Sequence, residues 1–524
     1  MNIKIFKKST LFLALALLLC TALFFTSCSL EALEQLVQGE QQEEEAEEKT
    51  KRPSKRTTEP GESEEDPNTT EPKEENDPLA SVGLSYHIDP VKQMCSVMGI
   101  GSCTDTHIRI PNQINGYAVT EIQSGAFHNN SQITGVTLPS TIESIGESAF
   151  DGCPNLCGNT YQNGIYLGSD ENPYLYLYQL VDKKISTIEI HPETRMIAGN
   201  TFGDCTNLTD LVIPAKVSKI GLLAFYNCGS LASITVAPQN AFYHSEGNCL
   251  IETASKSLIL GCKNSIIPTN GSVTRIEKRA FNDCRDLKEL TIPSTVTSIG
   301  QSALDGCESL IQTENGICYV DNWAVGYSDS IRELVLRENT VGISDFAFWS
   351  CSALKDLTLP THLRYVGEEA FWSCGQLTSV KFLGGTISLG KCSFWSCSQL
   401  TSVTILDGSV IIGDSAFLSC PKLTKVTVLG GEVAIGATAF WSCDALAELF
   451  LLGGTVSISA NAFWICDNLQ SVYFFGTKEE WETLSIHQRN DELFAATLYC
   501  YSPTEPTDPT GSYWHYLNGE PTPW

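Results

Sequence analysis

Cysteine is the residue type whose spacing most directly suggests chemistry, because 11 of the 21 cysteines occupy one position of a recurring Ala-Phe-x-x-Cys phrase. In an exported chain, such a column could form disulfide bonds. A buried cysteine, however, also behaves as a small hydrophobic residue. Because a uniform column gives each thiol two equivalent neighbours, we predict mostly reduced, buried thiols. The column consists of Cys153, Cys205, Cys228, Cys284, Cys307, Cys351, Cys374, Cys397, Cys420, Cys443 and Cys466.

Tryptophan forms a second column, since five tryptophans immediately follow the phenylalanine of the phrase and Leu418 interrupts them. If the phenylalanine points inward, the next residue is rotated toward the flank, which predicts a half-exposed ladder of indoles. We favour packing between adjacent repeats as the role of this ladder. The alternative is a contact strip for sugars or a partner protein. The candidate binding strip consists of Trp349, Trp372, Trp395, Trp441 and Trp464.

The sequence pattern offers little else for catalysis, cofactors or metal ions. The eight histidines fall at unrelated positions of the repeat and form no HExxH or triad-like motif. No phosphate-binding loop, GxGxxG motif or CxxC pair occurs. We therefore predict that the chain is not an enzyme and that it binds no cofactor or metal ion. The less favoured alternative is an enzyme within the long segments around Asn163, Asn248 and Asn315.

A repeat of constant length must position both columns. Within each unit, apolar and polar residues alternate over two short segments, which predicts two strands buried on one side. Ala-Phe followed by Cys and Leu at three-residue steps predicts a helical or 3₁₀ turn. Stacked units would form parallel ladders around a continuous core, so the predicted fold is a β-rich solenoid. The 23-residue period is set by Phe348, Phe371, Phe394, Phe417, Phe440 and Phe463.

Earlier copies of the repeat are separated by three longer gaps of 52, 56 and 44 residues. These lengths are close to twice 23, which predicts modified or double-length coils. Asn163, Asn248 and Asn315 each precede a strand-like run, so we expect hairpins that project from the solenoid. The earlier copies lie at Phe127, Phe150, Phe202, Phe225, Phe281 and Leu304.

The N-terminal residues 1–27 have the pattern of a lipoprotein signal peptide. Lys4, Lys7 and Lys8 precede an apolar run that ends in small residues before Cys28, which predicts cleavage there and lipidation of the Cys28 thiol. An ordinary secretory signal or an uncleaved anchor is the alternative. Residues 28–80 are predicted to be a disordered acidic tether, because 17 acidic and 6 basic residues between Ser29 and Ala80 give a net charge of −11.

The remaining chain divides into a solenoid and two covers. We assign residues 81–126 to an N-terminal cap with the first strands, 127–475 to the repeats, and 476–524 to a C-terminal cap and aromatic tail. Thr477 and Glu480 predict a capping box at the start of a short helix. Subtracting the three signal lysines and the −11 of the tether from −28 leaves −20 on the folded part, which excludes nucleic acid as a partner.

The Ala-Phe-x-x-Cys-x-x-Leu phrase, the Ile-Pro turn, the Ile-Gly step and the 23-residue period resemble the BspA-like leucine-rich repeat family of bacterial surface proteins. The resemblance extends over roughly residues 83 to 500. It implies a right-handed solenoid on the cell surface that serves in adhesion or in binding host or bacterial surface proteins, with glycans as the alternative ligands. The predicted localisation is therefore the bacterial cell surface, with a lipid anchor in the membrane.

Overall fold

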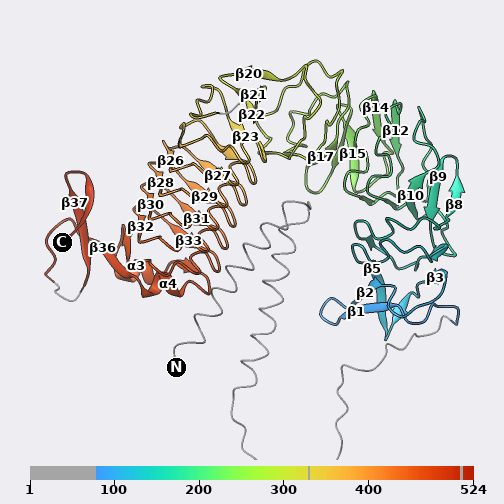
Figure 1. Cartoon of the computed structure of the whole chain (residues 1–524), viewed down its shortest axis with the longest axis horizontal. Helices are drawn as coiled ribbons and strands as arrows, with labels where there is room; N and C mark the ends of the chain where they lie inside the picture. Colours follow the sequence, from blue (N-terminus) through green and yellow to red (C-terminus); the bar gives the residue numbers. More distant parts are fainter. Residues whose placement is uncertain (1–77, 329–330, 508–510) are drawn as a thin grey trace, which may run out of the picture. The chain divides into compact units, whose positions relative to one another are not determined.

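The structure is a computed structural model that describes residues 78–328, 331–507 and 511–524 (Figure 1). The predicted signal peptide, the lipidation residue Cys28 and the predicted tether up to residue 77 lie outside the described residues. None of the described helices is long and apolar enough to cross a membrane.

Two parallel strand ladders form the C-terminal half of the array, and Figure 1 shows them as two rows of strand arrows. Neighbouring strands pair in register, as in Val380 opposite Val403, so each step advances the chain by 23 residues until the last step of each ladder, where Ser471 pairs with Thr497 and Ser457 with Ser485. The first ladder comprises β24 (Asp356–Leu359), β26 (Ser379–Phe382), β28 (Ser402–Ile405), β30 (Lys425–Val428), β32 (Glu448–Leu451), β34 (Ser471–Phe474) and β36 (Thr497–Tyr501). The second comprises β23 (Gly342–Ile343), β25 (Tyr365–Val366), β27 (Ile387–Leu389), β29 (Val410–Ile412), β31 (Val433–Ile435), β33 (Val456–Ile458) and β35 (Ser485–Ile486).

The N-terminal half repeats this plan in shorter sheets. A cap hairpin of β1 (Ser85–Asp89) and β2 (Met94–Gly99) begins it, and β2 pairs with β5 (Tyr117–Ile122). The short strand β4 (Gln113–Ile114) forms an antiparallel hairpin with β5. The other strands that stack between coils are β3 (His107–Arg109), β6 (Gly135–Thr137), β7 (Ser144–Ile145), β11 (Met196–Ile197), β12 (Asp210–Ile213), β13 (Lys219–Ile220), β14 (Ser233–Val236), β18 (Arg275–Ile276) and β19 (Ser298–Ile299).

The three long gaps each contain a hairpin, as predicted, and a third strand that rejoins the solenoid. Gly247 and Asn248, and likewise Asn315 and Gly316, have positive φ angles, which matches the tight turns of hairpins. The last strand of each meander pairs in parallel with the next coil. The meanders are β8 (Asn159–Tyr161), β9 (Gly164–Leu167) and β10 (Tyr176–Leu180); β15 (Tyr243–Glu246), β16 (Cys249–Glu252) and β17 (Ser257–Leu260); and β20 (Gln312–Glu314), β21 (Ile317–Val320) and β22 (Trp323–Tyr327).

The Ala-Phe segment forms consecutive tight turns, which we call the turn segment, and it contributes a third ladder of backbone hydrogen bonds. Within one coil, Trp372 N–H donates to the Glu369 carbonyl, three residues back, so the predicted helical or 3₁₀ turn occurs as single turns and not as a helix. Between coils, Phe371 N–H donates to the Ser393 carbonyl at 2.8 Å. Positive φ angles at Glu369 and Ser373 direct their N–H groups toward the next coil, where each also finds a carbonyl.

The core is filled by the apolar residues that recur in every unit. Phenylalanine rings stack from coil to coil, with centroids of Phe371 and Phe394 at 5.0 Å and those of Phe394 and Phe417 at 5.1 Å. Along β26, Val380 and Phe382 are buried while their neighbours point outward, which is the period-two pattern of a one-sided strand. The predicted fold class is therefore confirmed.

The C-terminal cap closes all three ladders. The helix α3 (Lys478–Glu482) begins with the predicted capping box between Thr477 and Glu480. A second helix, α4 (Asp491–Ala495), was not predicted. The segment before and within it supplies acceptors to the last turn segment: the Gln488 carbonyl, Asn490 Oδ1 and Glu492 Oε1 accept the N–H groups of Asn461, Phe463 and Ile465, respectively. The tail then forms the hairpin β37 (Tyr513–Leu517) and β38 (Glu520–Pro523).

Replacing Asn490 with alanine should destabilise the C-terminal coils. Asn490 is buried, and its side chain also donates to the carbonyls of Ser459 and His487 at 3.0 and 2.9 Å. We expect a loss of about 1–3 kcal/mol for each buried group left unpaired, measured by urea unfolding. The exposed Asn468→Ala variant is the matched control, with an expected change within about 0.5 kcal/mol. Equal effects of the two substitutions would contradict the capping role of Asn490.

Candidate functional site

The cysteine column lies in the core and bonds to the turn segments. Cys374 Sγ donates to the Phe348 carbonyl at 3.3 Å, and Cys397 Sγ donates to the Phe371 carbonyl at 3.4 Å. The same contact recurs in most regular coils. All 19 cysteines in the described part of the chain are free thiols, as predicted. Cysteine is therefore used here as a small apolar residue that also satisfies a buried carbonyl of the preceding coil.

Burial keeps these thiols protonated. It raises the pKa of Cys374 from an ordinary value of 9.0 to about 12, and it raises those of Cys228 and Cys307 to about 12 as well. A thiolate is the reactive form of cysteine, so thiols held in this state are poor nucleophiles. The column is consequently a structural feature and not a catalytic one.

The tryptophan column is a stacked ladder on the turn segments. The ring centroids of Trp372 and Trp395 lie 5.0 Å apart with an interplanar angle of 5°, and those of Trp349 and Trp372 lie 5.8 Å apart. Below the interruption at Leu418, Trp441 and Trp464 stack at 5.2 Å.

Exposure along this column is uneven. Trp349 is 44% exposed, Trp372, Trp441 and Trp464 are half-buried, and Trp395 is only 5% exposed. The half-exposed ladder that the sequence predicts is thus found at four positions and not at Trp395, which is enclosed between Trp372 and the coil of Leu418. Stacking covers the indole faces and leaves mainly their edges to solvent, which is the geometry expected of packing between coils.

A shallow cavity of about 630 Å³ lies over the second ladder, and the sequence pattern did not point to it. Tyr365 forms part of its wall and stacks on Trp323 with centroids 6.0 Å apart. Arg364, His362 and Glu338 supply charged and polar groups around it. The sequence signal for this cavity was Tyr365, an aromatic residue at an outward-facing strand position. A single tyrosine that does not recur in other repeats cannot be told apart from an ordinary surface residue.

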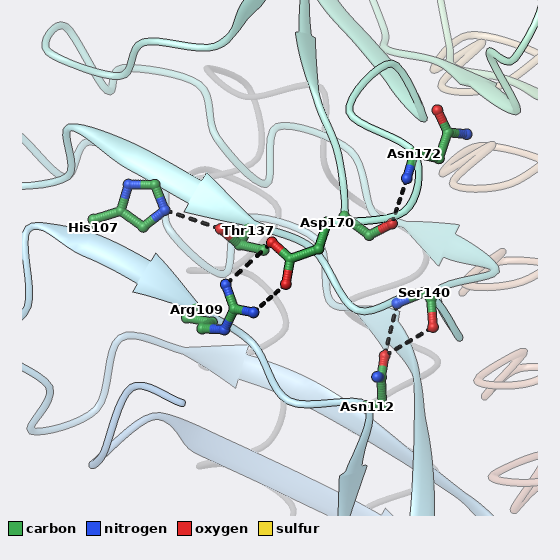
Figure 2. Close-up of polar contacts among 8 residues, drawn as sticks. His107, Arg109, Asn112, Thr137, Ser140, Asp170 and Asn172 are labelled. Carbon is green, nitrogen blue, oxygen red and sulfur yellow. Dashed lines mark hydrogen bonds and ion pairs between the residues drawn. The ribbon is translucent and has the colours of Figure 1, made fainter. Parts of the chain in front are cut away.

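The outward face of the first coils is occupied by polar side chains that bind one another (Figure 2). Arg109 on β3 forms an ion pair with Asp170, and His107 Nε2 lies 2.9 Å from Thr137 Oγ1 on β6. Asn112 Oδ1 accepts the N–H of Ser140 at 2.7 Å. These contacts tie neighbouring coils together, so this cluster serves the stacking of the N-terminal coils.

The carboxyl groups with the most perturbed pKa values belong to the turn segments near coil Phe371. Burial raises the pKa of Asp345 to about 7 and that of Glu369 to about 7, and repulsion from Glu368 acts in the same direction on both. Asp345 Oδ1 also accepts the Glu368 N–H at 2.9 Å. Neither group lies in the wall of the 630 Å³ cavity. No cluster of three or more His, Cys, Asp or Glu side chains suited to a metal ion occurs among the described residues.

Comparison with known families identifies the repeat. The family described as BspA type leucine-rich repeat region matches in six copies, over residues 101–169, 120–247, 174–270, 274–401 and 365–490. These matches span most of the chain. The chain belongs to the BspA-type leucine-rich repeat family. A search of curated proteins finds no match.

Several solved structures show low similarity to this BspA-type chain. A leucine-rich cell surface protein from Faecalibacterium prausnitzii A2-165 is 20% identical, with 78% of this chain and 98% of that chain covered and a TM-score of 0.31. A leucine-rich repeat protein from Bacteroides ovatus is 19% identical over 80% and 98% of the two chains, with a TM-score of 0.28. The pneumococcal vaccine antigen PcpA is 17% identical over 75% and 83%, with a TM-score of 0.24. The family assignment rests on the repeat match and not on these scores.

The protonated cysteine column should make stability depend on alkaline pH. The unfolded chain releases thiol protons near pH 9, whereas folded Cys374 holds its proton to a pKa of about 12. Stability is therefore full below pH 9 and falls as the pH rises through this window. Urea midpoints at pH 8 and pH 10 measure the fall, and Cys374→Ala should reduce its slope.

The same chain should titrate as free thiols once unfolded. We expect a thiol reagent in denaturant to count most of the 19 described cysteines, whereas in the folded protein it should react readily with the exposed Cys157 and slowly with the buried thiols. A count dominated by disulfides would overturn the prediction of reduced thiols.

Proposed function

We propose that this chain is a lipid-anchored protein of the bacterial cell surface whose repeat array binds partner proteins, with adhesion as the outcome. Membership of the BspA-type leucine-rich repeat family supports a surface role. The lipid anchor is inferred from the sequence before Cys28 alone. The partners proposed are proteins on host cells or on other bacteria.

The observation that carries the protein-binding role is an exposed aromatic patch beside the C-terminal cap. Phe475 is 45% exposed and stacks on Tyr501 at 4.5 Å, and Tyr516 is 43% exposed and contacts Trp514 at 5.1 Å. Exposed aromatic groups rimmed by polar residues are typical of protein interfaces. A long solenoid adds an extended surface on which neighbouring contacts can accumulate.

The second candidate function is capture of carbohydrate by the tryptophan column. Trp349 favours it, because this residue ends the upper stack and is the most exposed tryptophan of the five. The stacking of the other tryptophans disfavours carbohydrate capture, because sugars bind to the faces of aromatic rings and the inner indoles cover the faces of one another. A glycan array without hits would leave protein binding as the only proposed role.

A pull-down experiment tests the proposal directly. The full chain is immobilised and exposed separately to surface extracts of host cells and of bacteria. We expect a discrete set of proteins to be retained by the native chain and not by a chain with Phe475→Ser and Tyr516→Ser together. Retention of the same proteins by both chains would contradict a role for the aromatic patch.

Two tryptophan substitutions separate binding from packing. We expect Trp349→Ser to leave the unfolding midpoint nearly unchanged, whereas Trp395→Ser should cost about 3–5 kcal/mol because it removes a buried ring. If the column contacts a partner, Trp349→Ser weakens retention of that partner or of a glycan. Unchanged retention by Trp349→Ser would assign the column to packing alone.

The anchor is tested at Cys28. We expect the native chain to incorporate labelled fatty acid and to sediment with membranes, and Cys28→Ala to lose both properties while the repeats still fold. Incorporation of fatty acid by Cys28→Ala would contradict lipidation at this thiol.

A further inference from the structure

The ladder of turn segments is interrupted between the coils of Phe150 and Phe202. In the N-terminal half, Leu177 pairs with Ile197 in the sheet that corresponds to the second ladder, and Thr187 forms a single bridge with Asp210 on the side that corresponds to the first. The chain crosses from one ladder to the other in 10 residues after Leu177 but takes 13 residues after Ile197. The meander coil is therefore three residues short at this point, and the Ala-Phe turn does not form in it.

This shortening leaves backbone donors without acceptors. In a regular coil the N–H groups two residues before the phenylalanine, at it and two after it bond to the next coil, as those of Asn200, Phe202 and Asp204 do. The described residues supply no acceptor for the equivalent N–H groups of Ser148 and Phe150, although the Phe150 side chain is buried.

On the far side of the interruption, carbonyl groups lack donors. The carbonyl of Gly199 accepts no hydrogen bond within the described residues. The chain covers other groups with side chains: Lys183 Nζ donates to the Gly203 carbonyl at 2.7 Å, and Tyr178 Oη donates to the Phe150 carbonyl at 3.0 Å. The N–H groups of Ser148 and Phe150 and the carbonyl of Gly199 are therefore the backbone groups that these side chains leave without a partner within the described residues.

A pocket of about 350 Å³ occupies the interruption, and we call it the turn gap. Ser148 and Phe150 belong to one wall and Gly199 to the other, while Tyr176 and Met196 lie at the apolar base. Gly146 and Gly221 complete the walls. The side-chain positions of these two glycines are filled by backbone of the preceding coil, Ser124 at Gly146 and Gly199 at Gly221, so glycine here allows the coils on each side of the gap to pack closely.

The C-terminal cap shows what such donors bind. The last turn segment presents the same three N–H groups, at Asn461, Phe463 and Ile465, and a peptide segment of the cap covers them. The acceptors come from alternate residues of that segment, namely the backbone carbonyl of Gln488 and the side-chain oxygens of Asn490 and Glu492. A peptide whose oxygen acceptors recur every second residue therefore matches the spacing of the donors.

We propose that the turn gap binds an extended segment of a partner protein through its main chain. Carbonyls of the segment accept the N–H groups of Ser148 and Phe150, and its N–H groups donate to the Gly199 carbonyl. This mode extends an interrupted hydrogen-bond ladder, as strand addition does at a sheet edge. The proposal rests on the protein-binding function above and gives it a specific site.

The two walls together favour a peptide over a simple anion. Unpaired N–H groups alone would attract an anion. The Gly199 carbonyl on the facing wall and the exposed carboxylates of Glu147 and Asp151 would repel one, and the single cation in the lining, Lys219, does not offset both carboxylates. A ligand with alternating donors and acceptors complements both walls, and an extended main chain has this pattern.

The test selects a phage-displayed library of random short peptides on the full chain. A turn-graft variant, in which residues 178–184 are replaced by a copy of residues 198–207, restores the missing three residues and fills the gap. We expect enriched peptides to bind the native chain at least about ten-fold more tightly than the turn graft. As a matched control, three Gly/Ser residues inserted after Asp182 lengthen the loop without rebuilding the turn and should leave affinity within about two-fold.

Hydrogen exchange on the native chain gives a second measurement that does not depend on folding of the graft. In the free chain the Phe150 amide should exchange much faster than the paired Phe371 amide, and a bound peptide should slow Phe150 alone. The proposal is overturned if no peptide is enriched, if the graft binds the peptides equally, or if the Phe150 amide is already protected. If peptides bind at the gap but no protein is retained from the surface extracts, the proposed function is refuted while the peptide-binding site itself is supported.

Discussion

Backbone hydrogen bonding between coils is the constraint on which this structure depends. A 23-residue coil cannot satisfy its own strand and turn groups, so each coil needs a neighbour on both sides. This requirement explains the conserved unit length within the array, the polar contacts that join the first coils, and the acceptors that Asn490 and Glu492 bring to the last one. A coil that is locally shortened therefore leaves backbone N–H and C=O groups of its neighbours without hydrogen-bond partners.

Much of the fold follows from the sequence because its signals repeat. The strand positions, the three hairpins, the Thr477 capping box and the free thiols were all predictable from spacing and residue type. The turn ladder was not, since its contacts use backbone groups whose direction depends on positive φ at two positions per coil. In hindsight, the serine of the Phe-Trp-Ser-Cys phrase marks one of them, as Ser373 does, because small polar residues, like Asn and Gly in other copies, tolerate this conformation.

The candidate sites differ in how much of each could be predicted from the sequence. The tryptophan column was visible because it repeats, yet only the structure distinguishes exposed Trp349 from buried Trp395. The turn gap could not be predicted from the sequence. It arises because one coil is three residues shorter than a regular coil, and the groups that line it are backbone carbonyl and amide groups, which every residue type carries. The gap lengths of 52, 56 and 44 residues indicated irregular coils but not which face they would open.

The turn ladder also gives the array an electrical direction. In every regular coil the bridging peptide units point their N–H groups toward the C-terminal end, as Phe348, Phe371 and Phe394 do in succession. Aligned peptide dipoles add, so the six coils from Phe348 to Phe463 resemble a helix in having a positive end at their last coil. The Glu492 carboxylate is bonded at that end. A chain with an overall charge of −28 thus carries a localised positive potential at the end of this block of turn segments.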